Sequence, residues 1–463
     1  MAKKKKILLL SDDLRLHSGI ATMSKEIVLK TVHKYDWIQI GGAVKHPDEG
    51  KMFDLSESVK QETGVEDANV KIIPVSGYGN PDMVRNLISM ENVDAILHFT
   101  DPRFWGWLYQ MEDEIRRHIP IMYYNIWDDL PDPQWNAPFY ASCDILMAIS
   151  KQTYGINKRV LEKFGEDYKE WQIKYIPHGV SEKFYPISDK SELQKVDELR
   201  ENLGISDKKF VVLYNNRNIR RKNPGDVVLA YKEFCDKLTK NESKQCCLLL
   251  HTQQVDNNGT DLNEVIKNIC PDYDVVFTNM KFETDGLNLL YNLSDVTVNM
   301  ASNEGFGLAT CESIKAGTPI VVNVTGGLQD QCGFKLNGKY LTEQDYIKLG
   351  SLHNFREWEE NPNLTHGDWV KPVWPSNRSL QGSPATPYIF DDRCSFEEVS
   401  DKLYEWFVMG SDERKQCGLK GSEFANSTDS NMSSDNMGRL FVDAMEGTFK
   451  NWKPKNELIL CKL

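Results

Sequence analysis

The 463-residue sequence has no long apolar run, and this absence excludes the common kind of membrane protein. No stretch approaches the roughly 20 apolar residues that a membrane-spanning helix needs, so we expect no integral membrane contact. The apolar run Ile7–Leu10 follows Lys3–Lys6 but ends at Ser11-Asp12-Asp13. It is too short for the apolar core of a secretory signal peptide, which favours a cytoplasmic location.

Clustered cysteines and an excess of basic residues are also absent. The ten Cys include no Cys-x-x-Cys pair, so the sequence disfavours a zinc site, and we expect reduced thiols. Lys and Arg total 55 against 68 Asp and Glu, which gives a net charge of −13. Proteins that bind nucleic acids or anionic membranes usually carry a basic surface, so this charge disfavours both partners, although an acidic protein can still contain a basic cleft.

The composition that remains is that of an ordinary globular protein. Hydrophobic residues make up 40% of the chain and charged residues 27%. These proportions exclude a disordered chain, a collagen-like repeat and a coiled-coil rod as the main architecture. At roughly 100–200 residues per domain, the length indicates two to four domains.

Short apolar segments bounded by turn residues alternate with segments of helical spacing, which is typical of parallel sheets covered on both faces. In the first half the predicted strands are Lys6–Leu10, Trp37–Ile40, Val70–Val75, Ala95–Phe99, Ile121–Asn125, Ile145–Ile149 and Ile173–Ile176. After the charged stretch Ser188–Arg200 the predicted strands are Phe210–Tyr214, Cys247–Leu250, Val275–Phe277, Val296–Asn299 and Ile320–Asn323. The pattern predicts an α/β protein with two Rossmann-like, doubly wound domains that face a deep cleft.

We place the domain boundary at the charged stretch, which gives an N-terminal domain of residues 1–187 and a C-terminal domain of residues 188–430. Residues 331–395 interrupt the alternation, and their three Trp indicate an ordered insertion. We expect this insertion to pack over the mouth of the cleft or to mediate assembly. Residues 431–463 are predicted to form a C-terminal helix and tail that pack back toward the N-terminal domain.

The segment Glu304–Glu312 follows a predicted strand and opens a helix. A helix N-terminus offers free N–H groups and a positive potential to an anion, and the two glutamates can accept hydrogen bonds from sugar hydroxyls. This combination suits a ligand that carries both a diphosphate and sugars. The alternative is that the glutamates only stabilise the first turn of the helix.

The segment Asn215–Pro224 also follows a strand, and Asn223-Pro224 predicts an N-cap with Pro at the first helical position. Arg217 and Lys222 are five residues apart on this loop and can hold a diphosphate. The alternative is a solvated basic turn, which is less favoured because the chain is acidic overall and this is its densest internal basic run.

These residues resemble retaining glycosyltransferases of the GT-B fold, family 4 (glycosyl transferases group 1). Glu304 and Glu312 have the family's Glu-x7-Glu spacing, and Arg217 and Lys222 match its Arg-x4-Lys pair. Four further segments resemble the family's motifs in the family's order: Ile176–Val180, Val275–Met280, Leu289–Val296 and Val324–Gly327. The resemblance covers roughly residues 170–330, and residues 331–395 depart from it.

The resemblance implies that a hexosyl group moves, with retention, from a UDP- or GDP-sugar to an acceptor hydroxyl, with no metal or other cofactor required. It implies that Glu304 binds hydroxyls of the donor sugar, Glu312 the ribose, and Arg217 and Lys222 the diphosphate. It also places Gly305, Phe306, Gly307, Leu308, Gly19, Thr278 and Met280 at the donor. Asp272-Tyr273-Asp274 has the letters of a metal-binding motif but precedes a strand, so we interpret it as a solvated turn.

In this family the N-terminal domain receives the acceptor. Asp101 follows a predicted strand and is our candidate for a catalytic contact in the cleft. The other candidates on the acceptor side are two aromatic-rich loops and a strand residue, namely Trp105, Trp107, Trp127, Asp128, Asp129 and His98. The alternatives are packing of the aromatic side chains between long loops, a core position for His98, and a structural role for the interdomain residue His178.

The nucleotide sugar is the expected partner, and the acceptor class stays open between a glycan, a small molecule and modified DNA. A phage-type enzyme that glycosylates hydroxymethylated bases in DNA is the alternative within the fold, although the net charge counts against it. A GT-B nucleotide-sugar epimerase is the alternative of another class. A dinucleotide oxidoreductase is disfavoured because neither half has Gly-x-Gly-x-x-Gly after its first strand. The sequence does not indicate an oligomeric state.

Overall fold

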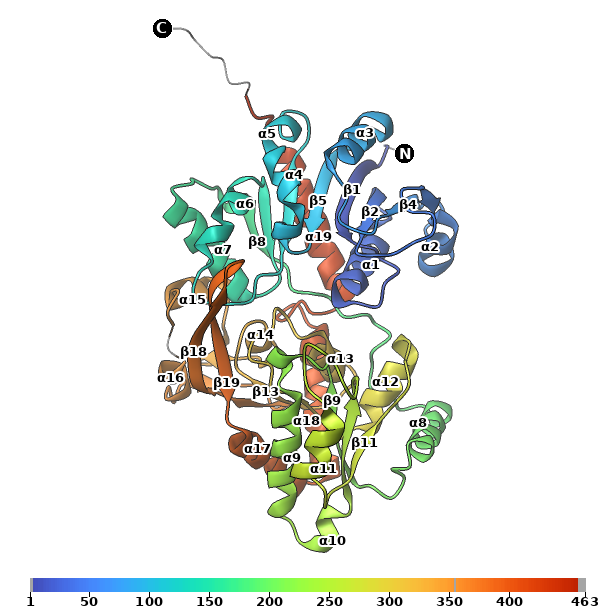
Figure 1. Ribbon diagram of the computed structural model, residues 1–463, viewed down its shortest axis with the longest axis vertical. Helices are drawn as coiled ribbons and strands as arrows, with labels where there is room; N and C mark the ends of the chain where they lie inside the picture. The colour runs from blue at the N-terminus through green and yellow to red at the C-terminus, as the bar shows by residue number, and fades with distance from the viewer. Residues whose placement is uncertain (1–2, 354, 457–463) are drawn as a thin grey trace.

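The computed structural model describes residues 3–353 and 355–456. Figure 1 shows two lobes, and the upper lobe is built on an eight-stranded sheet in the order β3-β4-β2-β1-β5-β6-β7-β8. Strand β3 pairs antiparallel with β4, and the other neighbours pair in parallel. The strands are β1 (Lys5–Asp12), β2 (Tyr35–Gly42), β3 (Phe53–Asp54), β4 (Val70–Pro74), β5 (Ala95–Phe99), β6 (Ile121–Asn125), β7 (Ile145–Ala148) and β8 (Ile173–Tyr175).

Helices cover both faces of this sheet, because successive side chains of a buried strand point to opposite faces. Leu8 and Leu10 belong to the apolar core on one face, while Ile7 and Leu9 belong to the core on the other. The α-helices of this part of the chain are α1 (Gly19–Thr31), α2 (Ser56–Thr63), α3 (Pro81–Glu91), α4 (Gly106–Gln110), α5 (Glu112–Ile115), α6 (Ala137–Ala141) and α7 (Lys151–Phe164). Short 3-10 helices are η1 (Pro102–Trp105), η2 (Gln134–Asn136) and η3 (Glu170–Gln172).

The lower lobe contains a six-stranded parallel sheet in the order β11-β10-β9-β12-β13-β17. Its strands are β9 (Phe210–Asn215), β10 (Cys246–His251), β11 (Val275–Phe277), β12 (Val296–Asn299), β13 (Ile320–Asn323) and β17 (Val370–Val373). Its helices are α8 (Lys190–Asn202), η4 (Arg220–Lys222), α9 (Pro224–Asp236), α10 (Lys240–Ser243), α11 (Leu262–Ile269), α12 (Thr284–Leu293), α13 (Leu308–Lys315), α14 (Leu328–Gln331), α17 (Phe396–Met409) and α18 (Ser411–Asn426).

Both sheets have a topological switch point, and these points determine where a ligand can bind. In the first sheet the chain builds β2 and β4 on one side of β1 and then returns to the other side with β5. In the second sheet β10 and β11 lie on one side of β9 and β12 lies on the other. Loops that leave the carboxyl ends of adjacent strands diverge at such a point and open a crevice.

Each strand predicted from the sequence matches a strand of the structure to within a few residues. The charged stretch Ser188–Arg200 corresponds largely to helix α8, which packs against α12. Asn223 is the N-cap residue and Pro224 begins helix α9, as predicted. The Asn223 side chain makes no capping hydrogen bond; it donates to the carbonyl of Met300 at 2.8 Å, and the Asn223 backbone is left-handed with φ +48°.

The described residues of the segment 331–395 form helices and strands, and the segment is not only an insertion. Strand β17 lies inside it and pairs with β13 as the sixth strand of the lower sheet. The segment also forms a long antiparallel hairpin, which Figure 1 shows rising from the lower lobe toward the upper one. Its other elements are β14 (Lys335–Leu336), β15 (Lys339–Tyr340), α15 (Glu343–Leu349), α16 (Arg356–Glu359), β16 (Leu364–Thr365) and the hairpin strands β18 (Pro375–Ser383) and β19 (Thr386–Cys394).

The last helix, α19 (Ser434–Asn451), lies in the upper lobe beside α1 although it follows the whole lower lobe in sequence (Figure 1). Met437 and Phe441 belong to the same apolar core as Ile7 and Leu9. A Cβ added to Gly438 would lie 2.6 Å from the Cβ of Lys30, so this glycine permits the close approach of α19 to α1. Residues 457–463 of the predicted tail lie outside the described residues.

Within the part of the chain that the structure describes, no helix combines the length and the apolar character needed to cross a membrane.

Candidate active site

A cavity of about 1420 Å³ lies between the lobes and is lined by loops from both switch points. From the upper lobe come the start of α1, the loop after β5 and the loop after β6; from the lower lobe come the loops after β9 and β12. Of the residues predicted for the site, those that line this cavity are Gly19, Asp101, Trp127, Asp128, Asp129, Arg217, Lys222, Glu304, Gly305, Phe306, Gly307, Leu308 and Glu312.

The loop that carries Glu304 is held rigidly by a glycine pair. The Gly327 N–H donates to the Glu304 carbonyl at 2.8 Å. A Cβ on Gly326 would lie 2.1 Å from that carbonyl oxygen, and a Cβ on Gly327 would lie 2.2 Å from the Gly305 carbonyl oxygen. The turn after β13 therefore needs glycine at both positions, and it fixes the backbone from which helix α13 begins.

Glu304 and Lys222 form an ion pair across the two loops of the lower lobe, with their side chains 12% and 7% exposed. Burial favours the protonated form of Glu304, but the nearby Lys222 and Arg221 outweigh it and lower the pKa of the carboxyl. Glu304 is therefore ionised at neutral pH, when its remaining acceptor capacity is available to a ligand in the cleft.

Glu312 lies within α13, and its surroundings differ from those of Glu304. Its carboxylate accepts a hydrogen bond from the Tyr291 hydroxyl at 2.7 Å, and that hydroxyl accepts one from the Asn215 side chain at 2.7 Å. Burial raises the pKa of Glu312 to about 7, and the Tyr291 hydrogen bond only partly opposes this. Glu312 therefore changes charge near neutral pH.

Arg217 and Arg221 both line the cavity, but they have different partners. The Arg217 side chain is 58% exposed and forms an ion pair with Asp256 at 3.0 Å. Arg221 donates to the Asn303 carbonyl at 2.6 Å. Desolvation in the cleft disfavours its charge, but the carboxyl groups of Glu304, Asp128 and Asp129 outweigh this and raise the pKa of Arg221. The sequence offers no reason to single out Arg221, since spacing alone does not tell which side chains of a basic run reach the cleft.

On the upper lobe three carboxyl groups line the cavity. Asp101 caps η1, accepts from the Arg103 N–H at 2.9 Å and forms an ion pair with the Arg103 guanidinium. Burial raises the pKa of both Asp128 and Asp129, and Asp129 accepts a hydrogen bond from the Asn303 side chain of the lower lobe. These groups can accept or donate hydrogen bonds to hydroxyls of a ligand.

Three residues predicted for the acceptor side do not reach the cleft. His98 is fully buried, and its Nδ1 lies 2.6 Å from the Tyr109 hydroxyl. Burial lowers the pKa of His98 to about 3, so it is neutral. Trp105 is also fully buried, with its indole N–H donating to Thr100 at 3.2 Å. Trp107 packs on Trp105 at a centroid distance of 5.6 Å and against the same core. The packing alternative is therefore correct for these side chains.

Two predicted donor residues, Thr278 and Met280, also lie outside the cavity lining. Thr278 directly follows β11, the edge strand of the sheet. Its hydroxyl is buried and lies 2.8 Å from Nδ1 of His251. Met280 is 42% exposed on the loop that follows.

His178, in the segment between the lobes, is buried within the interface. Its Nδ1 lies 2.8 Å from the Tyr124 hydroxyl, and its ring meets the Phe306 ring edge to face at 5.2 Å. Burial lowers its pKa to about 3. His178 therefore links β6 to the start of α13 as a neutral side chain.

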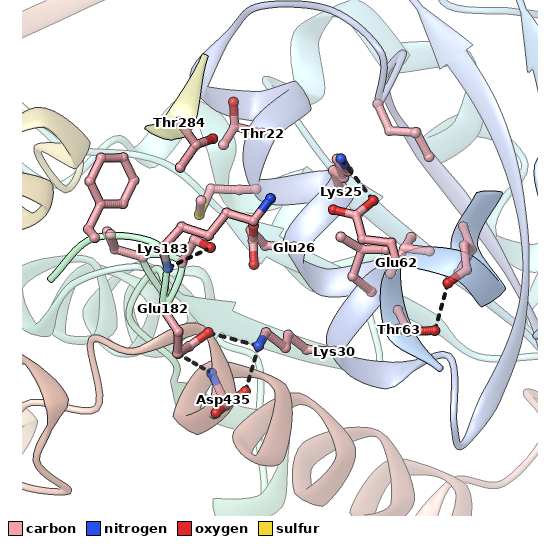
Figure 2. A pocket seen from close by; sticks show the side chains of 18 of the residues that line it. Thr22, Lys25, Glu26, Lys30, Glu62, Thr63, Glu182, Lys183, Thr284 and Asp435 are labelled. Carbon is pink, nitrogen blue, oxygen red and sulfur yellow. Dashed lines mark hydrogen bonds and ion pairs between the residues drawn. The ribbon is translucent and has the colours of Figure 1, made fainter. Parts of the chain in front are cut away.

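A second cavity of about 1400 Å³ adjoins the first behind α1 (Figure 2). Lys30 lies there between Glu182 and Asp435, at 2.8 and 2.6 Å. The two cavities share lining residues, among them Glu312 and Phe282.

Among the described residues no group of three or more His, Cys, Asp or Glu side chains is arranged to hold a metal ion.

One segment of the lower lobe matches a known protein family. Residues 195–349 match the family described as Glycosyl transferases group 1. The chain is 26% identical over 226 residues to an uncharacterized glycosyltransferase, MJ1607, of Methanocaldococcus jannaschii, covering 47% of this chain and 52% of that protein. It is 26% identical over 194 residues to a mannosylfructose-phosphate synthase of Agrobacterium fabrum, covering 41% and 39%. The matched segments thus span about half or less of these relatives.

Solved structures show the same architecture over nearly the whole chain. Anabaena Alr3699/HepE, in complex with UDP and glucose, superposes with a TM-score of 0.62 at 13% identity, covering 96% of this chain and 99% of that one. The predicted fold class is confirmed: the protein has the GT-B fold, with two Rossmann-like lobes that face a cleft. It carries, in the lower lobe, a segment that matches Glycosyl transferases group 1.

Proposed function

We propose that the protein is a retaining glycosyltransferase that moves a hexosyl group from a UDP- or GDP-sugar to an acceptor hydroxyl. The observation that carries the proposal is the arrangement around α13. Glu304 lies in the loop before that helix and is paired with Lys222, and Glu312 lies within the helix; both line the cavity with Arg221, where the loops of the switch point between β9 and β12 open. A diphosphate flanked by two sugars matches cations flanked by two carboxylates.

In this proposal the diphosphate binds between Lys222, Arg221, Arg217 and the free N–H groups at the start of α13. Glu304 accepts hydrogen bonds from hydroxyls of the transferred sugar, and Glu312 from the ribose. The cations stabilise the negative charge that develops on the departing nucleotide, which is electrostatic stabilisation in a site prepared for that charge. Lys222 then exchanges part of its interaction with Glu304 for the phosphate.

Retention follows if the acceptor attacks from the face that the nucleotide leaves. The bond between the anomeric carbon and the phosphate oxygen breaks, the bond to the acceptor oxygen forms, and the acceptor proton passes to the leaving phosphate oxygen. Unlike a retaining glycosidase, this route needs no carboxylate nucleophile at 5–5.5 Å from an acid. Asp101, Asp128 and Asp129 then position the acceptor from the upper lobe.

Three comparisons support the donor class. The matched family is one of glycosyl transferases, MJ1607 is named as a glycosyltransferase, and HepE was solved with UDP and glucose. These are properties of those proteins, and UDP-glucose is for that reason the first donor to test here. A cytoplasmic location and independence from metal ions stay predictions.

The test is to incubate the protein with a panel of UDP- and GDP-sugars, with and without EDTA, and to measure released nucleotide and the anomeric configuration of the product. We expect release from one donor, insensitivity to EDTA, retention, and loss of release in Glu304→Ala. An inverted product contradicts the retaining mechanism. Accumulation of an epimeric nucleotide sugar without a new glycoside contradicts transfer altogether.

A further inference from the structure

The hairpin β18–β19 lies outside the segment 195–349 that matches the family, and a buried aspartate anchors its base in the lower lobe. Asp392 forms an ion pair with Arg378, accepts from the Thr325 hydroxyl at 3.0 Å, and is 5% exposed. Its carbonyl accepts from the Asn323 side chain at 2.8 Å. The hairpin therefore projects from the carboxyl end of β13 as a rigid extension of the lower lobe.

The other end of the hairpin is bonded to the upper lobe. Arg103 donates from one guanidinium nitrogen to the Ala385 carbonyl in the turn, at 2.7 Å, and to the hydroxyl of Thr386. The same guanidinium is held by Asp101 at the end of β5. The hairpin thus spans the interlobe cavity from one lobe to the other.

Three further contacts fix the middle of the hairpin on the segment after β6. The Phe390 N–H donates to the Leu130 carbonyl at 2.6 Å. The Tyr388 ring meets Trp135 edge to face at a centroid distance of 4.5 Å, and its hydroxyl donates to the Asp132 carbonyl at 3.2 Å. Tyr388 and Phe390 are two positions apart, so their side chains lie on the same face of β19.

The opposite face of β19 lines the cavity. Side chains alternate along a strand, so Phe390 and Asp392 face the lobes while Ile389, Asp391 and Arg393 line the cavity. From the turn and the end of β18, Thr386, Ser383 and Gln381 continue the same lining. The proposed function uses none of these side chains.

The charge of this part of the cavity indicates what it can bind. Asp391 faces the same space as Asp128 and Asp129, whose pKa values are raised by burial. Two arginines of this part of the cavity already have partners: Arg103 has Asp101 and the turn, and Arg393 donates to Asn223 at 2.9 Å and lies 3.7 Å from Asp391. A third, Arg221, lies near Asp128 and Asp129, and the proposed function assigns it to the diphosphate. Carboxyl groups bind hydroxyls well, whereas a phosphate needs free cations.

We propose that the β18–β19 hairpin, latched to the upper lobe by Arg103, forms the outer wall of the acceptor pocket and selects a small, neutral, hydroxyl-rich acceptor through Asp391. The proposal rests on the proposed function for the reaction itself. Arg103 is a positioning residue, and Asp391 determines acceptor specificity. A duplex DNA acceptor is disfavoured, because its phosphates would meet the carboxyl groups of the pocket.

The latch is tested without any acceptor by hydrogen–deuterium exchange of Arg103→Ala. The control is Arg85→Ala, since Arg85 also forms a bidentate ion pair on the upper lobe, with Glu114, but far from the hairpin. Loss of a hydrogen bond to a charged donor predicts roughly tenfold faster exchange at residues 381–386 in Arg103→Ala. Arg85→Ala leaves the exchange of that segment unchanged. Equal exchange of that segment in the two variants overturns the latch.

The acceptor class is tested with UDP-glucose, or the donor identified above, and a panel of neutral sugars, glucose 6-phosphate and hydroxymethylated duplex DNA. We expect transfer to a neutral sugar, and in Asp391→Asn a rise of about tenfold in the KM for that sugar with the donor KM unchanged. Asp401→Asn, on the surface of α17, serves as the control and keeps both constants. Transfer only to the phosphorylated sugar or to DNA, no transfer to any neutral sugar, or an unchanged acceptor KM overturns this part of the proposal.

Failure of the proposed function is recognised separately. UDP binding, measured by titration calorimetry, depends on the Glu304 and Lys222 side of the cleft and not on the hairpin. If neither UDP nor GDP binds, the proposed function and with it the acceptor class fail, while hydrogen–deuterium exchange still decides whether Arg103 holds the hairpin.

Discussion

The two lobes contribute to the cleft in different ways. On the lower lobe the candidate site residues come from two segments, each between one strand and the next helix, and glycines and backbone hydrogen bonds hold these segments. On the upper lobe the side chains of the loops that line the cavity are placed by aromatic packing and by contacts with the hairpin. The positions of the side chains on the lower side of the cleft are thus determined by nearby backbone contacts, whereas those on the upper side depend on residues far apart in sequence.

The sharpest test of the lower side is a double-mutant cycle on Glu304 and Lys222. Each of Glu304→Gln and Lys222→Met should reduce turnover by roughly 10²–10³-fold, because each removes a charge from the site where charge develops. The double variant should lose little more than either single one, since the two groups act as a unit. Steady-state kinetics measures this, with the exposed Glu198→Gln in α8 as a control. Fully multiplicative losses would mean that the two groups act separately.

A backbone test comes next in size. Gly327→Ala places a Cβ 2.2 Å from the Gly305 carbonyl, so the loop carrying Glu304 must move. We expect a loss of about 1–3 kcal/mol in stability, as for overpacking of a close contact, together with weaker UDP binding. Differential scanning fluorimetry and calorimetry measure both. The matched control, Gly447→Ala in α19, meets no atom within 4 Å and should stabilise its helix slightly.

A smaller effect is expected from pH. The pKa of Glu312 is raised to about 7, so the unfolded chain loses this proton at a lower pH than the folded protein. Its contribution to stability is therefore present at acidic pH and declines as pH rises from about 4.5 to about 7. Because ionised Glu312 is the better acceptor for ribose hydroxyls, UDP affinity should rise severalfold over the upper part of this window. Glu312→Gln should show a flat profile, and an unchanged slope would mean that another group titrates.

The smallest effect on activity is expected on the upper side, at a residue that the structure removes from the cleft. His98→Phe leaves the Tyr109 hydroxyl without its partner in the core, which costs about 1–3 kcal/mol of stability. Both Michaelis constants should stay within twofold of their original values in the folded enzyme. A large rise in the acceptor KM would instead place His98 near the acceptor.

Much of the fold could be predicted because buried parallel strands are continuous apolar runs, as in Phe210–Tyr214 and Val296–Asn299. The hairpin β18–β19 was not predicted because its strands are largely polar and show no regular alternation of apolar and polar residues, as in the segment Pro375–Ser383. Strand β17 was not predicted because it is short and contains Pro372.

Within the site, the positions of Glu304, Glu312 and Lys222 follow from a spacing that a strand–turn–helix unit imposes. The choice between Arg217 and Arg221 does not, since it depends on contacts with Asp256 and Asn303 from other loops. The same reason explains the errors at Trp105 and Trp107. An aromatic residue in a loop after a strand can turn toward the cleft or toward the core. Here both side chains pack in the core with Tyr78 and Tyr109.

The position of α19 has a consequence for biosynthesis. The core of the upper lobe includes Met437 and Phe441, which the ribosome adds more than 250 residues after β8, the last strand of that lobe's sheet. Until then the part of α1 that packs against α19 has no cover, although the lower lobe can already assemble. Folding during translation should therefore finish at the first lobe, and the nascent chain should depend on chaperones in this interval.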